Sequence, residues 1–411
     1  MASRSLRWSL RIVTLAALGG CVPRYAGAPA MTYAEVDYSS VDGKPWPTKT
    51  LVISELRERY GMPLDMSVTY VELNPEGKRT LVFVHGLGSY LKFWRYQLDH
   101  FAALGYRVLA LDMVGYGKSD KPASFPYTTE AMAEVLRVFV AKTGANRPVI
   151  IGHSMGGQTA LSYAIRYPDA LSAAVLAAPA GFEHFGKQEK LWFRRVFSTD
   201  LIKAGREYDL WGSIRFNNFD DWRSDYEWLV EERVRTAKSS EFESYAYANV
   251  KSVHGLLENE FVRFNLDKIH APTLIIHGDM DRLIPNRYLH GGSTRGVMED
   301  GQDGIAGSTL VTLDGCGHTV QMDCSAAFNE AVAAFLQGLP PLPPVVEPPP
   351  VVEPEPPPVV EPPPVVEPPP VVTPVDEPPT EEPAEEPSTE EPAVEETTEA
   401  PAEEAPTRPG F

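Results

Sequence analysis

The stretch Arg147-Pro-Val-Ile-Ile-Gly-His-Ser-Met-Gly-Gly-Gln-Thr-Ala-Leu-Ser-Tyr-Ala-Ile-Arg-Tyr167 places a serine between glycines where a strand gives way to a helix. Residues 149–151 are a β-branched run, and the residues after the glycines carry apolar side chains at helical spacing. Ser154 therefore falls in a tight turn, in which Gly152 and Gly156 leave room for a strained backbone. A turn of this kind lifts the serine hydroxyl clear of the sheet and predicts a nucleophile.

Apolar strand patterns alternate with helical patterns on both sides of this turn. We expect strands at residues 66–73, 80–84, 107–111, 149–151, 171–176, 272–277 and 309–313. Strands that alternate with helices favour a mostly parallel sheet with helices on both faces. The sequence therefore predicts an α/β fold, with a core formed by residues 51–181 and 265–338.

Residues 182–264 interrupt this alternation. They contain no buried strand pattern, look mainly helical, and hold 17 aromatic residues among 83. Most of these rings would form the core of a helical subdomain. Because the segment follows a strand of the sheet, it emerges at the carboxyl edge where ligands of such sheets bind, and we expect a helical lid.

A serine nucleophile needs a histidine base and an acid that orients it. His318 follows the strand pattern at 309–313, and Asp281 follows the pattern at 272–277. Both side chains are therefore expected at the same sheet edge as Ser154. Asp279 is a second candidate for the acid, although a role as a turn residue is more typical of its position.

The order of these motifs resembles that of the α/β-hydrolase fold enzymes over roughly residues 66–338. The motifs are His85-Gly86, the loop Asp112-Met-Val-Gly-Tyr-Gly-Lys-Ser-Asp120, the elbow Gly152-His-Ser-Met-Gly-Gly157, the acid loop His277-Gly-Asp-Met-Asp-Arg-Leu-Ile-Pro285, and Gly317-His318. The resemblance implies Ser154 as nucleophile, Asp281 as acid and His318 as base. It also implies that the amides of Leu87 and Met155 form the oxyanion hole. Residues 291–307 lengthen the connection before the last strand relative to the family pattern.

These residues favour a serine hydrolase that cleaves a small hydrophobic carboxylic ester, with an acyl or aryl group, through an acyl-serine. A carbon-carbon bond hydrolase of a diketone is an enzymatic alternative, since such lidded enzymes share the elbow. A binding protein with an idle triad is a third hypothesis. We expect no metal and no cofactor, because the nine histidines show no paired ligand spacing.

The C-terminal residues 339–411 differ sharply from the rest of the chain. They hold 26 of the 39 prolines and 18 acidic residues against one basic residue. This composition predicts a disordered Pro/Glu-rich tail that acts as a spacer, with possible contact to a cell wall; a Pro-rich ligand for a partner is the alternative. The acidic balance belongs to this tail, and no basic patch suggests nucleic acid.

The N-terminus has the pattern of a targeting segment. Arginines at positions 4, 7 and 11 precede a short apolar run, and Leu18-Gly19-Gly20-Cys21 resembles the cleavage box of bacterial lipoproteins. We expect residues 1–21 to be a lipoprotein signal, with Cys21 lipidated and the protein anchored to a membrane of the cell envelope. An ordinary secretory signal is the alternative. Residues 22–50 lack periodicity and are expected to form a tether.

Two further cysteines, Cys316 and Cys324, flank His318. An oxidising compartment would allow them to pair. Because the geometry of a disulfide is narrow, two small buried thiols are the favoured interpretation.

Overall fold

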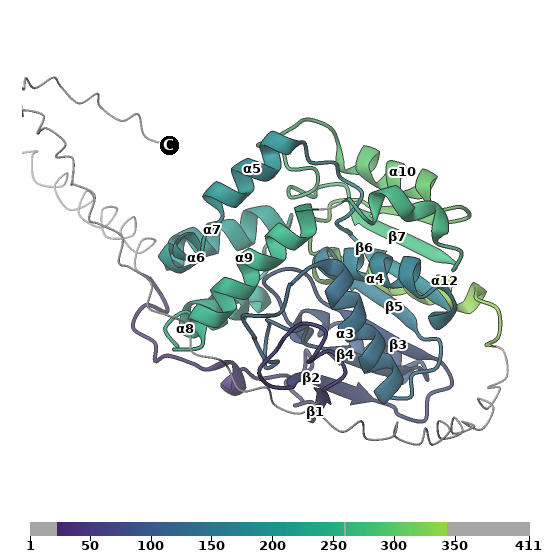
Figure 1. The fold of residues 1–411 in the computed structure, drawn as a ribbon, viewed down its shortest axis with the longest axis horizontal. Coiled ribbons are helices and arrows are strands. Elements are labelled where there is room, and N and C mark those ends of the chain that lie inside the picture. Colours follow the sequence, from purple (N-terminus) through teal and green to yellow (C-terminus); the bar gives the residue numbers. More distant parts are fainter. Residues whose placement is uncertain (1–22, 259, 343–411) are drawn as a thin grey trace, which may run out of the picture. The chain divides into compact units, whose positions relative to one another are not determined.

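Within the described residues, eight strands form one mostly parallel sheet (Figure 1). The computed structural model describes residues 23–258 and 260–342. The strand order is β1-β2-β4-β3-β5-β6-β7-β8; β2 pairs antiparallel with β1 and β4, and the other pairs are parallel. The strands are β1 Thr48–Ile53, β2 Met66–Leu73, β3 Thr80–Val84, β4 Arg107–Leu111, β5 Val149–His153, β6 Ala173–Ala177, β7 Thr273–Gly278 and β8 Thr309–Leu313. The predicted α/β class and mostly parallel sheet are confirmed.

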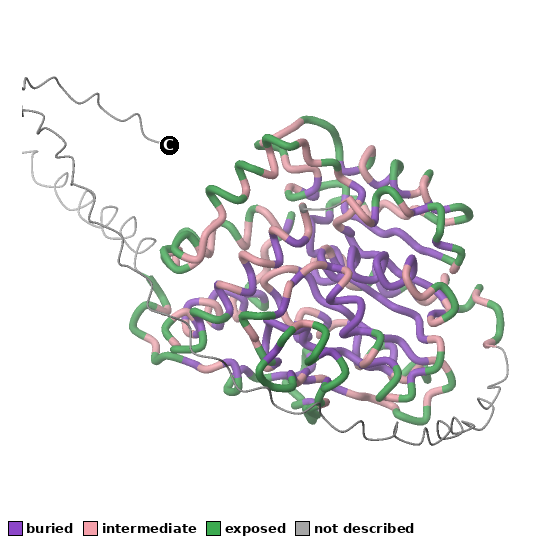
Figure 2. The backbone as a smooth tube through the Cα atoms, viewed as in Figure 1, coloured by how far each residue is buried: buried purple, intermediate pink, exposed green. Residues whose placement is uncertain are grey.

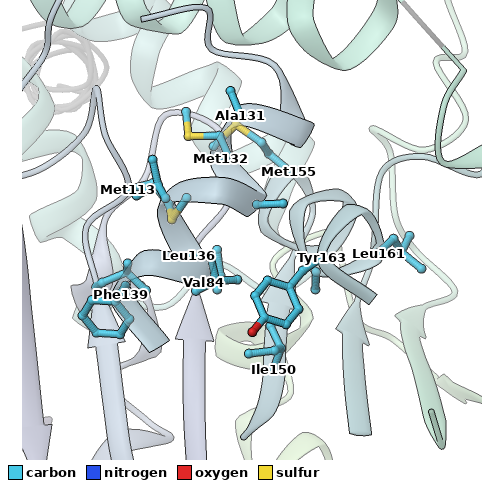
Figure 3. Close-up of a cluster of buried hydrophobic side chains, with 14 of the residues drawn as sticks. Val84, Met113, Ala131, Met132, Leu136, Phe139, Ile150, Met155, Leu161 and Tyr163 are labelled. Carbon is cyan, nitrogen blue, oxygen red and sulfur yellow. The ribbon is translucent and has the colours of Figure 1, made fainter. Parts of the chain in front are cut away.

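Side chains of the central strands alternate between two hydrophobic clusters, one on each face of the sheet. In β3, Val82 and Val84 belong to one cluster and Leu81 and Phe83 to the other, all fully buried. The α-helices that contribute to the first cluster include α3 Thr129–Lys142, α4 Met155–Arg166, α9 Phe242–Glu258 and α10 Thr294–Gly304; those of the second include α2 Leu98–Ala103 and α12 Ser325–Gly338. Figure 3 shows part of the first cluster, where side chains of α3 and α4 lie above the strands. Burial of each large apolar side chain contributes about 1.5–3 kcal/mol, so this two-sided core fixes the strand ends.

The first described residues pack against the domain, so the predicted tether is wrong for most of its length. Tyr38 Oη donates to Asp112 Oδ2 at 2.6 Å, and Trp46 Nε1 donates to Asp99 Oδ2 at 2.9 Å. Strand β1 begins within the predicted tether and extends the sheet beyond β2. The physical reason is burial of large side chains, namely Met31, Tyr33, Val36, Tyr38 and Trp46. Their irregular spacing gives no strand or helix periodicity in the sequence.

Among the residues described between β6 and β7, five α-helices group together beside the sheet (Figure 1). They are α5 Lys187–Val196, α6 Thr199–Ala204, α7 Glu207–Asn218, α8 Glu227–Thr236 and α9 Phe242–Glu258. Helices α5 and α6 contact α9, and α7 contacts α8. The predicted helical insertion is therefore present, and because it follows β6, it starts at the carboxyl edge of the sheet.

Short helices complete the described part of the chain. They are η1 Tyr33–Glu35, η2 Leu91–Trp94, η3 Pro168–Ala170, η4 Ser224–Tyr226, η5 Arg263–Lys268 and α11 Val320–Asp323. Helix α10 occupies the long connection noted at residues 291–307, and Met298 anchors it in the first cluster.

The two predicted end segments fall outside this description. The expected lipoprotein signal at 1–21, with Cys21, and residues 343–411 of the expected tail are not among the described residues. In the described part of the chain, no helix is both long enough and apolar enough to cross a bilayer.

Candidate active site

Ser154 occupies a strained position between β5 and α4. Its backbone has φ 52° and ψ −115°, a conformation that costs a non-glycine residue energy. The flanking glycines permit it: a Cβ atom at Gly156 would lie 2.2 Å from the carbonyl oxygen of Val84, and one at Gly152 would lie 2.2 Å from that of Gly156. The Ser154 amide donates to the Ala177 carbonyl at 2.9 Å, which ties the turn to β6. The sheet thus holds the serine in place at the end of β5.

Asp281 and His318 meet at the ends of β7 and β8. His318 Nδ1 donates to Asp281 Oδ2 at 2.8 Å, and both side chains are almost completely buried. The other carboxylate oxygen, Oδ1, accepts from the amides of Leu283 at 2.8 Å and Ile284 at 3.1 Å. These bonds orient the carboxylate, and the bond at Nδ1 leaves Nε2 of the imidazole as the acceptor. A histidine in this tautomer can remove a proton from a hydroxyl.

Asp279, the other candidate acid, bonds to a neighbouring turn. Its Oδ1 accepts from the amide of Gly315 at 2.7 Å and so closes the turn that precedes the histidine loop. The structure brings Asp281, not Asp279, to His318.

Ser154 and His318 line the same cavity, which has a volume of about 220 Å³. Among the described residues, no hydrogen bond joins the two side chains. Catalytic hydrogen bonds are often long without substrate and shorten in the substrate complex. The arrangement therefore places a nucleophile and a base on one wall of a small chamber.

The amides of Leu87 and Met155 are free to receive a developing negative charge. Met155 is the first residue of α4, where an amide has no acceptor within the helix. In the described part of the chain, neither amide donates to a backbone carbonyl outside the regular helices and strands. Leu87 also lines the cavity that holds Ser154. That these two amides form an oxyanion hole stays a prediction.

The loop that carries His318 is closed by a disulfide bond. Cys316 and Cys324 are joined, with their Cα atoms 5.9 Å apart, so the prediction of two free thiols is wrong. The short helix α11 turns the chain back and brings the two Cα atoms within the range that a disulfide requires. Asp323 Oδ2 accepts from the amide of Gly317 at 2.7 Å, which adds a second tie inside the loop.

His153 also holds the loop of His318, a contact that the sequence did not reveal. Its Nε2 donates to the carbonyl oxygen of His318 at 3.1 Å. Burial, followed by the nearby imidazole of His318, keeps the pKa of His153 well below its usual value of 6.5. His153 is therefore neutral and acts as a fixed donor. The sequence shows only that His153 directly precedes Ser154 at the end of β5. Its contact with the loop of His318 is visible only in the fold.

The chamber is mainly apolar, with charged groups among its lining residues. Phe185, Phe193 and Phe197, from the start of the insertion, α5 and the end of α5, line the cavity together with Ser154. The other apolar and polar residues that line it are Leu87, Ala180, Val253, Leu256, Leu257, Val262, Leu283 and Ile284, with Gln158, Glu183, Lys190, Glu260 and Arg263. Such a cavity suits a small substrate with an apolar group.

A second cavity of about 350 Å³ adjoins the first and shares Leu87 and Phe197 with it. Arg233 of α8 lines this second cavity, and its Nη1 is buried without a hydrogen-bond acceptor. The guanidinium lies 4.6 Å from the ring centroid of Phe242 and 4.7 Å from that of Tyr245. A buried donor without an acceptor is costly, so this position can accept an anionic group of a ligand. The sequence reasoning missed Arg233 because no motif surrounds it.

No group of three or more histidine, cysteine, aspartate or glutamate side chains that could hold a metal ion is found within residues 23–258 and 260–342.

Comparison with known proteins agrees with this geometry. Residues 79–324, more than half of the chain, match the alpha/beta hydrolase fold family. A relative from Klebsiella pneumoniae, named 2-hydroxy-6-oxononadienedioate/2-hydroxy-6-oxononatrienedioate hydrolase, is 29% identical over 271 residues, which cover 64% of this chain and 88% of that protein. Solved structures share the fold. A probable hydrolytic enzyme from Pseudomonas aeruginosa PAO1 has a TM-score of 0.63 at 24% identity, covering 75% of this chain and 99% of that one. An esterase from Exiguobacterium antarcticum has a TM-score of 0.55 at 23% identity, covering 66% and 96%.

The chain belongs to the alpha/beta hydrolase fold family and is an enzyme of that family. Its predicted fold is thereby confirmed.

Proposed function

We propose that this protein is a serine hydrolase that cleaves a small carboxylic ester with a hydrophobic acyl or aryl group. The observation that carries the proposal is the bond of 2.8 Å between His318 and Asp281 in the cavity that Ser154 lines. The strained turn of Ser154 supports it, because strain at such a site is typical of a functional position.

In the first half of the reaction, Ser154 Oγ attacks the ester carbonyl carbon while His318 Nε2 takes its proton. The oxyanion of the tetrahedral intermediate accepts hydrogen bonds from the amides of Leu87 and Met155; one donor of this kind contributes about 2.7–4 kcal/mol. His318 then gives the proton to the leaving alcohol, and the acyl group stays on Ser154. Asp281 stabilises the imidazolium without taking a proton.

In the second half, His318 Nε2 takes a proton from a water molecule that attacks the acyl-serine. The second tetrahedral intermediate uses the same two amides. Its collapse releases the carboxylic acid and returns the proton to Ser154 Oγ. The apolar rings of Phe185, Phe193 and Phe197 exclude bulk water and favour an apolar acyl or aryl group.

A series of p-nitrophenyl esters of increasing acyl length tests this assignment. A cavity of about 220 Å³ predicts that short and medium chains react fastest and that turnover falls as the chain outgrows the chamber. Ser213→Ala is a matched control, because Ser213 lines the adjoining cavity and is not among the residues that line the cavity of Ser154. If the parent protein hydrolyses none of these esters faster than Ser154→Ala does, the ester assignment is rejected.

Carbon-carbon bond hydrolysis of a diketone is the second candidate, and Arg233 favours it. The Klebsiella relative is named for a dienedioate, a substrate with two carboxylates. Arg233 Nη1, buried without an acceptor beside the catalytic chamber, could receive one such carboxylate. A 2-hydroxy-6-oxo-dienedioate tests this hypothesis. If it is the substrate, it should outperform every ester, and Arg233→Gln should raise its KM about tenfold or more while a neutral ester is unaffected.

A binding protein with an idle triad is the remaining alternative. It would show no turnover of either substrate class, although substrates could still bind in the cavity.

We also propose that the protein is lipidated at Cys21 and anchored to a membrane of the cell envelope. The sequence Leu18-Gly19-Gly20-Cys21 after a short apolar run supports this proposal. Mass spectrometry of the mature N-terminus should find diacylated Cys21. A mature N-terminus beyond that residue, without an acyl group, would contradict it.

The Pro/Glu-rich tail is proposed to be a spacer, on the basis of composition alone. Deletion of residues 343–411 should leave small-ester kinetics and Tm nearly unchanged. A several-fold loss of activity would show that the tail contributes to the site.

A further inference from the structure

The three helices α5, α6 and α7 expose large apolar side chains to an unusual degree. None of their residues is buried, in contrast to α8, which buries five (Figure 2). Their exposed large apolar residues are Leu191, Trp192, Val196, Leu201, Tyr208 and Phe216, each at least 38% exposed. Exposed apolar side chains on neighbouring helices of one segment are the raw material of an interaction surface.

Helix α5 has two distinct long faces. Its inner face carries Lys190 and Phe193, which line the catalytic cavity. Its outer face exposes Leu191, Trp192 and Arg195, at a spacing of one and four residues that places them on one side of the helix. A helix with aromatic and aliphatic residues beside basic ones on its outer side has the composition of a helix that lies in a lipid interface.

The charge of this region differs from that of the rest of the described chain. Residues 187–218 hold seven basic and four acidic residues, a net charge of +3, whereas the other described residues carry a net charge of −8. The basic residues are Lys187, Lys190, Arg194, Arg195, Lys203, Arg206 and Arg215. A basic region attracts anionic lipid head groups with about 1 kcal/mol for each lysine or arginine near the surface. The same charge disfavours a symmetric contact with a second copy, because two regions that each carry a net charge of +3 would then face each other.

The chain that follows the expected lipid anchor is fixed to the same region. The amides of Arg24 and Tyr25 donate to the carboxylate of Glu207 in α7, at 2.5 and 2.8 Å. Lys238 Nζ donates to three carbonyl oxygens of this segment, including that of Tyr25 at 2.8 Å. The described chain therefore starts beside α7, and Arg24 follows Cys21 by three positions in the sequence.

We propose that the exposed side chains of α5–α7, which we call the outer lid face, dock on an anionic lipid bilayer. The apolar side chains of the outer lid face enter the head-group region, and its exposed basic residues contact lipid phosphates. Those basic residues include Lys187, Arg195, Lys203 and Arg206. Docking places the wall of the catalytic cavity formed by Lys190 and Phe193 directly beneath the membrane contact. The proposal concerns a surface and does not depend on which bond the enzyme cleaves.

The test is flotation of the full-length chain with vesicles, in a Cys21→Ser background so that no acyl group contributes. Binding is expected to vesicles of equal phosphatidylglycerol and phosphatidylcholine, to be weaker for phosphatidylcholine alone, and to fall as salt rises. The double variant Leu191→Ser/Trp192→Ser should bind at least about tenfold more weakly, because two apolar side chains no longer enter the interface. The matched control is Leu64→Ser: Leu64 is 75% exposed but lies outside the outer lid face, and it should bind as the parent does.

A second measurement guards against binding by other parts of the chain. An environment-sensitive dye attached in Trp192→Cys should be quenched by lipids that carry a nitroxide, while the dye in Leu64→Cys should be quenched by aqueous iodide. Equal vesicle binding of the parent and the double variant, or a dye at position 192 that stays in water, would overturn the proposal. Analytical ultracentrifugation tests the alternative that this face binds a second copy of the chain. That alternative would hold if the parent dimerised, the double variant did not, and neither bound vesicles.

Discussion

The central strands and helices α5–α7 are opposite extremes of packing in this molecule. Every residue of β3, β5, β6 and β7 is buried, whereas no residue of α5, α6 or α7 is (Figure 2). Regions with few buried contacts open at low free energy, and close-packed regions open only with global unfolding. The sheet can therefore hold reacting atoms in place, while the outer helices can adapt to a ligand or a surface.

The cavity that Ser154 and His318 line takes lining residues from both regions. Ser154 and His318 come from turns at the ends of the packed strands, and Phe193 and Phe197 come from α5 and its end. We infer that the sheet sets the chemistry and the insertion sets the choice of substrate. The predictions below separate the two contributions.

The largest expected effect is on chemistry. Ser154→Ala and His318→Ala should each lower kcat by about 10⁴–10⁶, because members of a triad act as a unit. Phe193→Ala, in α5, should mainly raise KM, by about tenfold or less. Steady-state kinetics on the best ester measures both. A similar loss of kcat in all three variants would contradict the inference that the sheet sets the chemistry and the insertion sets the choice of substrate.

The identity of the acid gives the next largest effect. Asp281→Asn should lower kcat by about 10⁴, since it disturbs the tautomer and orientation of His318. Asp279→Asn is the matched control, because the Asp279 carboxylate accepts from the amide of Gly315 in the neighbouring turn. Should Asp279→Asn be the damaging change, the acid is wrongly assigned.

Stability should follow the same division. Phe83→Ala, in the centre of β3, should lower the free energy of unfolding by about 3–5 kcal/mol through a large cavity. Phe216→Ala, on α7 and 58% exposed, should change it by less than about 0.5 kcal/mol. Urea denaturation compares the two variants, and comparable losses would show that α7 is as firmly packed as the sheet.

The disulfide beside His318 should have an intermediate effect. Replacing both Cys316 and Cys324 with serine should lower the free energy of unfolding by about 2–3 kcal/mol, the loop-closure term for a short loop. It should also lower kcat, because the loop that carries His318 loses one of its ties. Differential scanning calorimetry and ester kinetics test the two effects; unchanged values in both would mean that the disulfide is dispensable.

The smallest effect concerns pH at the junction of α5 with the core. His290 bonds to Glu189 at 2.8 Å and to Glu183 at 2.6 Å. Partial burial alone would lower the pKa of His290, but these two carboxylates outweigh burial and raise the pKa above its usual 6.5. The ion pairs therefore stabilise the fold fully below pH 6.5, and this stability is lost as pH rises through the raised pKa. The change in the free energy of unfolding should be at most about 1 kcal/mol, and His290→Gln should abolish it in Tm measurements from pH 6 to 8.

The sequence predicted the parts of this molecule that depend on local pattern. Strands β2, β3, β4 and β8 lie at the predicted residues, because continuous or alternating apolar runs determine them. The glycines around Ser154 made the turn visible in the same way, since only small residues fit there.

The features that the sequence did not predict depend on contacts between distant segments. Tyr38 and Trp46 bond to residues of a distant loop and helix. No periodic pattern in the N-terminal segment therefore predicts that it packs against the domain. The bond between Cys316 and Cys324 depends on how α11 turns, and His153 gains its role only because the loop of His318 folds over β5. Tertiary geometry, not residue type, decides each of these.

Covalent labelling by a fluorophosphonate tests the central claim most directly, because the reagent bonds to a serine only where a base and an oxyanion hole activate it. Peptide mass spectrometry of the labelled protein should place one phosphonyl group on Ser154. The label should be absent in Ser154→Ala and strongly slowed in His318→Ala, and it should persist in Ser213→Ala. No labelling of the parent protein, or labelling at another serine that survives Ser154→Ala, would contradict the assignment of a serine hydrolase.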